Sequence, residues 1–264
     1  VRVVEIPWSR PGVGGIGRRL AARVSFQAQI FLRLLFRRRL GAVVVASEPG
    51  PTGLTAMLVR IWRDLPMLYW LMEIQPEAAV RASHLPRNGW RHRWGGRVHR
   101  ALCRSAESVV VMDRYMRREV LRDPHFPESD CSKVETIAPW PLSWADPEES
   151  QEHGMADPRM RRALAKAGVF VVGMDPEKVG HTHPHLVYTA MARGRPILYL
   201  GPRESPIGEM VRLCGFGWVV DPEETQPLPE RVRDILSLDP EEREQIGARG
   251  RQVIEQSYHP ELLG

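Results

Sequence analysis

The amino-acid sequence predicts an α/β protein with two Rossmann-like lobes, each built on a parallel sheet, of which the second is incomplete. Short β-branched runs alternate with helical patterns, and a segment rich in proline and acidic residues interrupts this alternation between Pro141 and Pro158. Charge is also divided unevenly. Residues 1–122 contain 22 arginines, no lysine and 8 acidic residues, whereas residues 123–264 contain 15 basic and 24 acidic residues. This division favours two domains, the first facing an anionic partner.

The first lobe is expected to span residues 1–142. Apolar, β-branched runs predict strands, and the helical spacing between them predicts crossover helices, as in successive βα units. The expected strands are 1–6, 42–46, 67–72, 108–112 and 134–138, and the expected helices are 18–39, 52–64, 90–104 and 113–122.

A linker is expected at 143–157, and the second lobe at 158–264. Only three strands are predicted in this lobe, few for a complete Rossmann-like domain. They are 168–174, 196–200 and 217–220, with helices at 184–193, 205–214, 228–238 and 240–257. Asp239 is expected to cap the last helix, because Pro240 follows at the first helical position. Val171 and Leu198 are expected in the core of this lobe.

The composition predicts a cytoplasmic location. The three cysteines lie far apart, which fits a reduced compartment better than a disulfide scaffold. The opening run VRVVEIPW resembles a strand and lacks the features of a signal peptide.

An arginine-bracketed apolar segment extends from Arg18 to Arg39. It falls short of the roughly 20 apolar residues needed to span a bilayer. Two compatible interpretations remain: a helix lying on an anionic membrane surface, at the inner face of the membrane, or a crossover helix packed on the sheet. Nucleic acid is not a predicted partner, because the arginines follow no known nucleic-acid-binding signature.

Polar residues follow two of the predicted strands, where ligands of open α/β sheets bind. Glu73, Gln75 and Glu77 come after the third strand, and the two carboxylates could orient a sugar hydroxyl or stabilise a cationic transition state. Alternatively, Glu77 only favours a helix N-terminus. Asp113 is expected to cap a helix, and Arg114 could face a ligand.

A third polar segment runs from His181 to Glu209. Its alternating histidines lack accompanying carboxylates or cysteines at zinc-site spacing, so no metal site is predicted. Gly201, Pro202 and Ser205 form a turn between a strand and a helix, where free backbone N–H groups would suit a diphosphate.

Several segments, in the same order along the chain, resemble bacterial family-4 glycosyltransferases of the two-lobed GT-B fold, in particular those of exopolysaccharide or O-antigen assembly. They are 69–80, 108–121, 135–142, 165–202, the most specific, and 217–222. The resemblance implies retaining transfer of a sugar from a nucleotide-sugar donor to a lipid-linked or other acceptor, without a metal or other cofactor. It implies an acceptor-side first lobe and a donor-side second lobe. Glu73 and Glu77 would be catalytic, with Gln75 and Arg114 on the acceptor side. Donor binding would fall to His183, Pro184, Tyr188, Gly201, Pro202 and Ser205.

The sequence also departs from the family pattern. His181 and Thr189 stand where relatives commonly carry two glutamates, and the usual first part of the donor lobe is missing between Trp140 and Ala167. A second hypothesis therefore stays open: a catalytically inactive relative that binds a membrane or a protein partner.

Overall fold

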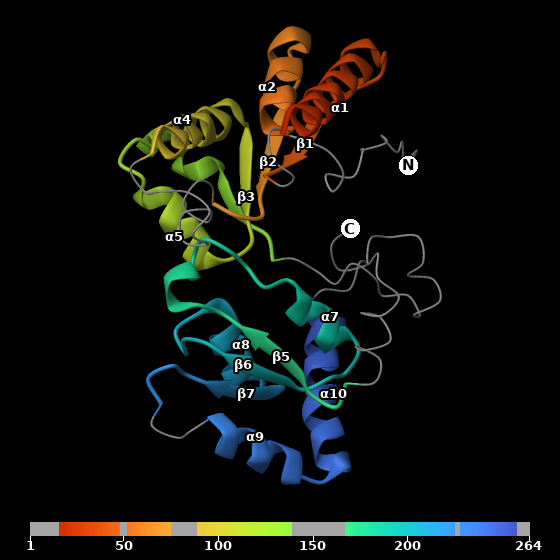
Figure 1. Cartoon of the computed structure of the whole chain (residues 1–264), viewed down its shortest axis with the longest axis vertical. Coiled ribbons are helices and arrows are strands. Elements are labelled where there is room, and N and C mark those ends of the chain that lie inside the picture. Colours follow the sequence, from red (N-terminus) through yellow and green to blue (C-terminus); the bar gives the residue numbers. More distant parts are fainter. Residues whose placement is uncertain (1–15, 48–51, 75–88, 139–166, 225–227, 258–264) are drawn as a thin grey trace. The chain divides into compact units, whose positions relative to one another are not determined.

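The computed structural model describes residues 16–47, 52–74, 89–138, 167–224 and 228–257 (Figure 1). The chain divides into two compact units, one of residues 1–112 and 116–137, the other of residues 113–115 and 138–264. The predicted strand at 1–6 and the predicted linker lie outside the described residues, so the predicted domain limits stay predictions.

The first unit holds a four-stranded parallel sheet whose strands pair in chain order, β1-β2-β3-β4. Helices connect successive strands, as the alternation of apolar runs and helical patterns predicted. The elements are α1 (Ile16–Phe36), β1 (Val43–Ala46), α2 (Thr52–Arg63), β2 (Met67–Leu71), α4 (Trp90–Ser105), β3 (Ser108–Val111), α5 (Arg114–Arg122), the 3-10 helix η1 (Glu128–Lys133) and β4 (Val134–Thr136). The first two residues of α5 belong to the second unit.

The core of the first unit lies between this sheet and its helices. Val109 and Val111 of β3 are fully buried, as is Val59 of α2. Gly53 allows α2 to approach α4, because a Cβ on this residue would lie 2.7 Å from the Leu102 side chain. A Cβ at this position would therefore have to displace the end of the Leu102 side chain where the two helices approach.

α1 packs against α2 and the core of the first unit, as the interpretation of a packed helix for the segment from Arg18 to Arg39 expected, whereas the strand expected before it lies outside the described residues. Phe31 and Leu34 pack against the core, and Thr55 of α2 donates a 2.6 Å hydrogen bond to Gln27. Figure 1 shows α1 and α2 side by side. In the described part of the chain, no helix is long and apolar enough to cross a membrane.

A partly buried histidine in the first unit has a lowered pKa. His99 of α4 lies beside the Tyr69 ring, with its Nε2 3.7 Å from the Cys103 sulfur. Its Nδ1 is buried without a hydrogen-bond partner among the described residues. Burial lowers the pKa of His99 from 6.5 to about 4, and the attraction of Asp123 opposes this only in part. Burial also raises the pKa of the Cys103 thiol to about 12, so this cysteine stays protonated.

We predict that the free energy of unfolding falls as the pH drops from about 6.5 to about 4. In that window the unfolded chain protonates His99 and the folded chain does not, so acid favours unfolding, by about 3 kcal/mol in total. Urea titrations across this window should show the loss, and His99→Gln should flatten it. His125→Gln, at an exposed position, is the matched control. Equal pH dependence in the wild type and His99→Gln would contradict this assignment.

The second unit holds a three-stranded parallel sheet in the order β5-β6-β7. Both connections between its strands are helical, and the last helix packs on these two crossover helices. Its elements are β5 (Phe170–Gly173), the 3-10 helix η3 (Pro176–Lys178), α7 (Leu186–Ala192), β6 (Ile197–Leu200), α8 (Pro206–Cys214), β7 (Gly217–Val220), α9 (Leu228–Ser237) and α10 (Pro240–Ser257). The predicted fold class, α/β with two parallel sheets, is confirmed.

Local signals explain where the helices of the second unit begin and end. Asp239 caps α10 as predicted, since its Oδ1 accepts a 2.9 Å hydrogen bond from the Glu241 N–H. Gly215 ends α8 in a left-handed conformation (φ 65°), which glycine adopts without strain.

One core prediction was wrong. Leu198 is 3% exposed as expected, but Val171 is 58% exposed. The two residues are register partners and point to the same face of the sheet, but Leu198 lies on the central strand β6 and Val171 on the edge strand β5 of the described sheet. The β5 side chain that packs into the core is the next one, Val172, on the other face.

Candidate functional site

The turn after β6 carries three of the predicted donor-binding residues, Gly201, Pro202 and Ser205, at the carboxyl edge of the second sheet. Gly201 is buried, and a Cβ there would lie 2.8 Å from both the Met174 carbonyl oxygen and the Tyr199 hydroxyl. Only glycine therefore lets the chain turn here against the end of β5.

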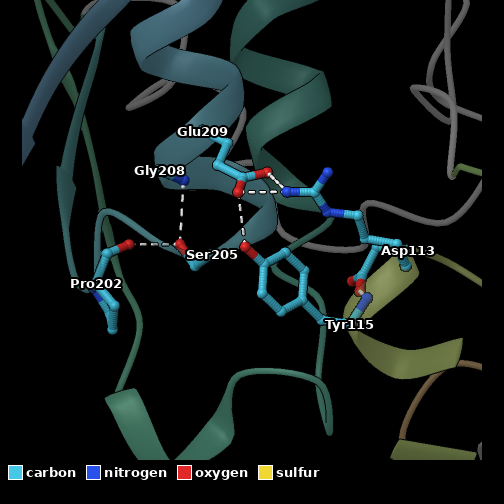
Figure 2. Close-up of polar contacts among 7 residues, drawn as sticks. Asp113, Tyr115, Pro202, Ser205, Gly208 and Glu209 are labelled. Carbon is cyan, nitrogen blue, oxygen red and sulfur yellow. Dashed lines mark hydrogen bonds and ion pairs between the residues drawn. The ribbon is translucent and has the colours of Figure 1, made fainter. Parts of the chain in front are cut away.

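Ser205 fixes the turn and begins α8. Its Oγ donates a 2.6 Å hydrogen bond to the Pro202 carbonyl and accepts a 3.1 Å bond from the Gly208 N–H (Figure 2). The Tyr199 hydroxyl lies 2.7 Å from the same oxygen, and burial raises its pKa to about 12. A serine hydroxyl has one hydrogen and two lone pairs, so these contacts use all of them. Ser205 thus shapes the loop, and a ligand here would meet backbone groups.

Residues 113–115 belong to the second unit, and Asp113 places its buried carboxylate beside His183, one of the predicted donor-binding residues. Asp113 Oδ2 lies 2.7 Å from His183 Nδ1, and His183 Nε2 lies 3.1 Å from the Tyr188 hydroxyl. The His183 and Tyr188 rings are stacked, with their centroids 5.7 Å apart. Asp113 Oδ1 also accepts from the Tyr115 N–H at 2.8 Å, which confirms the predicted helix cap. The His183 and Asp113 side chains are almost wholly buried, so this network positions the loop before α7.

Arg114, Tyr115 and Glu209 form a second, more accessible cluster (Figure 2). The Arg114 guanidinium pairs with the Glu209 carboxylate, and the Tyr115 hydroxyl donates to that carboxylate at 2.7 Å. Burial is the largest cause that raises the pKa of Tyr115, so its phenol stays protonated at neutral pH. Arg114 remains mostly exposed, and it is the side chain of this cluster that an anionic ligand can reach.

A carboxylate also stands at the end of β7. Asp221 accepts hydrogen bonds from the Arg203 N–H at 2.7 Å and the Glu223 N–H at 3.1 Å. These two bonds lower the pKa of Asp221. An ionised carboxylate at the carboxyl edge of a parallel sheet is suited to accept hydrogen bonds from sugar hydroxyls.

The structure places eight of the ten predicted site residues. Glu73 follows β2 in the first unit, where its backbone N–H donates a 3.2 Å bond to the Ser47 hydroxyl. The other seven lie in the second unit: Arg114, His183, Pro184, Tyr188, Gly201, Pro202 and Ser205. Gln75 and Glu77 fall outside the described residues. The catalytic and binding roles of all ten stay predictions.

Four polar residues of this region were not predicted as site residues: Tyr115, Tyr199, Glu209 and Asp221. Tyr115 and Glu209 lie in the first turns of α5 and α8, Tyr199 is the penultimate residue of β6, and Asp221 follows β7. The predicted residues were chosen for similar positions at strand ends and helix starts. His181 is buried, with its Nδ1 3.2 Å from the Val179 carbonyl oxygen. Among the described residues, no group of three or more His, Cys, Asp or Glu side chains could hold a metal ion.

No protein-family model matches the chain, and no curated protein matches its sequence. Among solved structures, the fold is similar to CalG4, the calicheamicin glycosyltransferase, with 12% identity and a TM-score of 0.41, over 96% of this chain and 81% of that one. It is also similar to Anabaena Alr3699/HepE in complex with UDP, with 12% identity and a TM-score of 0.42, over 90% of this chain and 80% of that one. The same protein in complex with UDP and glucose is similar with 13% identity and a TM-score of 0.45, over 89% of this chain and 77% of that one. None of these similarities reaches a TM-score of 0.5.

Proposed function

We propose that this chain is a glycosyltransferase that binds a nucleotide-sugar donor at the carboxyl edge of its second sheet. The observation that supports this most is the position of the longest family-like segment, residues 165–202. It contains β5, α7 and β6, so its polar loop around His183 and its closing turn at Gly201 both lie on the second unit. Ligands of open parallel sheets bind beyond the carboxyl ends of the strands.

Two further features fit an anionic, hydroxyl-bearing donor. α8 begins at this edge behind a capped, glycine-dependent turn, and the positive end of a helix favours phosphate. Arg114 adds an accessible cation, and Asp221 adds a hydroxyl acceptor. The finer parts of the proposal rest on the sequence resemblance: transfer of a hexose with retention, a family-4 type of enzyme, polysaccharide assembly and a lipid-linked acceptor.

A second candidate is a relative that no longer transfers sugar. His181 and Thr189 replace the two glutamates common in the family, and the His181 ring is buried rather than presented to a ligand. Such a protein would keep the fold without turnover.

Calorimetric titration of the full chain with UDP, GDP and their sugars tests the proposal. We expect saturable binding of one nucleotide and its sugar, with affinity in the micromolar to millimolar range common for enzyme substrates. Arg114→Gln should weaken that binding about tenfold, the loss typical of one charge-assisted contact. Arg212→Gln, which removes an exposed arginine from α8, is the matched control.

Transfer is tested separately. Release of free nucleotide from the bound nucleotide sugar, in the presence of membrane extract as a source of acceptor, would support turnover, and the anomeric configuration of the product would report retention. Binding without turnover would favour the inactive relative. A folded chain that binds no nucleotide at millimolar concentration would refute the donor site.

A further inference from the structure

We infer that the paired ends of α1 and α2 form a docking surface for an anionic phospholipid bilayer. This surface, the helix-end patch, consists of Phe36, Ile61 and Trp62 together with Arg37, Arg38 and Arg39. It goes beyond the proposed function, because neither a donor nor an acceptor site is needed for it.

Hydrogen bonds bring the two helix ends together. The Arg63 guanidinium at the end of α2 donates to the carbonyl oxygens of Leu34, Leu35 and Arg37 at 3.2, 2.8 and 2.7 Å. These are carbonyls at and just beyond the end of α1, which have no partner within a helix. The Arg63 contacts therefore hold the last turn of α1, and the arginines after it, beside the last turn of α2.

Large apolar side chains are exposed at both ends. Phe36 is 75% exposed, Trp62 71% and Ile61 61%. On α2, Leu58 joins Ile61 and Trp62 at spacings of three and four residues, so these side chains lie on one face of the helix. The opposite face of α2 is the one that packs on the core, through Ala56 and Val59. Water thus meets an aromatic and aliphatic surface that the fold does not use.

The charges around the apolar side chains are of one sign. Arg37, Arg38 and Arg39 are all exposed, and no acidic residue occurs in the sequence from 6 to 47. Tryptophan and phenylalanine lie favourably at the headgroup level of a bilayer, and arginines next to them attract anionic lipids. A second copy of this chain is a poorer partner, because a two-fold contact through the patch would place these arginines against each other.

This surface differs from the one that the sequence predicted. A helix lying flat would use the whole segment from Arg18 to Arg39, but Phe31 and Leu34 of that segment pack inward. The apolar side chains at the ends of α1 and α2, and the arginines that follow α1, remain to contact a bilayer.

Co-sedimentation of the full chain with phospholipid vesicles tests the inference. We expect binding to vesicles of mixed phosphatidylglycerol and phosphatidylcholine, and at least tenfold weaker binding to phosphatidylcholine alone. The double variant Phe36→Ser/Trp62→Ser should lower the partition coefficient about tenfold or more, since it removes two large apolar side chains from the interface. Replacing Arg37, Arg38 and Arg39 by glutamine should reduce binding to the anionic vesicles to the level seen with phosphatidylcholine.

Leu213→Ser is the matched control, because Leu213 is also exposed but lies on α8 of the second unit. It should bind vesicles as the wild type does. Failure of the folded wild type to bind anionic vesicles, or undiminished binding by the double variant, would overturn the inference. So would a concentration-dependent dimer that the double variant abolishes, since the patch would then pair two copies. Nucleotide titration of the same variants separates this result from the donor site, because patch variants should bind nucleotide normally.

Discussion

Leu198→Asp is expected to unfold the second unit, whereas Val171→Asp should leave it folded. The two residues are register partners on neighbouring parallel strands, β6 and β5. Leu198 is almost completely buried and Val171 faces water. A carboxylate at position 198 would have to lose its hydration without gaining a partner, which costs more than about 4 kcal/mol and exceeds what a small three-stranded unit can spare. The same carboxylate at position 171 should change stability by less than about 0.5 kcal/mol.

Thermal and urea unfolding followed by circular dichroism measure this difference. The pair is informative because the two side chains point to the same face of one sheet, and they differ in burial, with Leu198 on the central strand β6 and Val171 on the edge strand β5 of the described sheet. If Leu198→Asp melts like the wild type, Leu198 is not buried in the folded unit. If Val171→Asp unfolds the unit, the Val171 side chain is buried in the folded protein rather than exposed to water.

The secondary structure could be predicted from this sequence because the pattern of apolar residues agrees with the fold. The strands of a parallel sheet are short apolar runs separated by amphipathic helices, so β1 to β7 fell where apolar residues gather. Which side of a strand is buried was not readable at β5. The run Phe170–Gly173 is apolar throughout, and a uniformly apolar run does not tell which face the helices will cover.

In the candidate site, too, the sequence predicted some features and not others. Strand ends and a serine–proline helix start are local signals, and they marked Gly201 and Ser205 correctly as a turn between a strand and a helix. The partner of Asp113 was not readable, because His183 lies 70 residues away in the chain. Sequence showed its role as a helix cap, which one carboxylate oxygen fulfils, but only the fold shows what the other oxygen contacts.

Gly201→Ala should abolish nucleotide binding, while Gly173→Ala should retain it. Both glycines lie at the carboxyl edge of the second sheet, one closing β5 and the other following β6. A methyl group at 201 would meet the Met174 carbonyl oxygen and the Tyr199 hydroxyl at 2.8 Å, whereas at 173 it would meet no atom within 4 Å. Neither neighbour of Gly201 can yield easily, since one is backbone and the other is tied to Ser205.

The Gly201→Ala methyl must therefore displace the turn and, through Ser205, the start of α8. We expect a loss of about 1–3 kcal/mol in stability, typical of overpacking, and a loss of at least about a hundredfold in nucleotide affinity, because backbone groups aimed at a phosphate tolerate little misplacement. Calorimetric titration of both variants, each first shown to be folded, measures the affinities. Gly201→Ala with wild-type affinity would place the donor away from this turn. Equal losses in both variants would mean that the whole sheet edge, rather than the β6–α8 turn, holds the nucleotide.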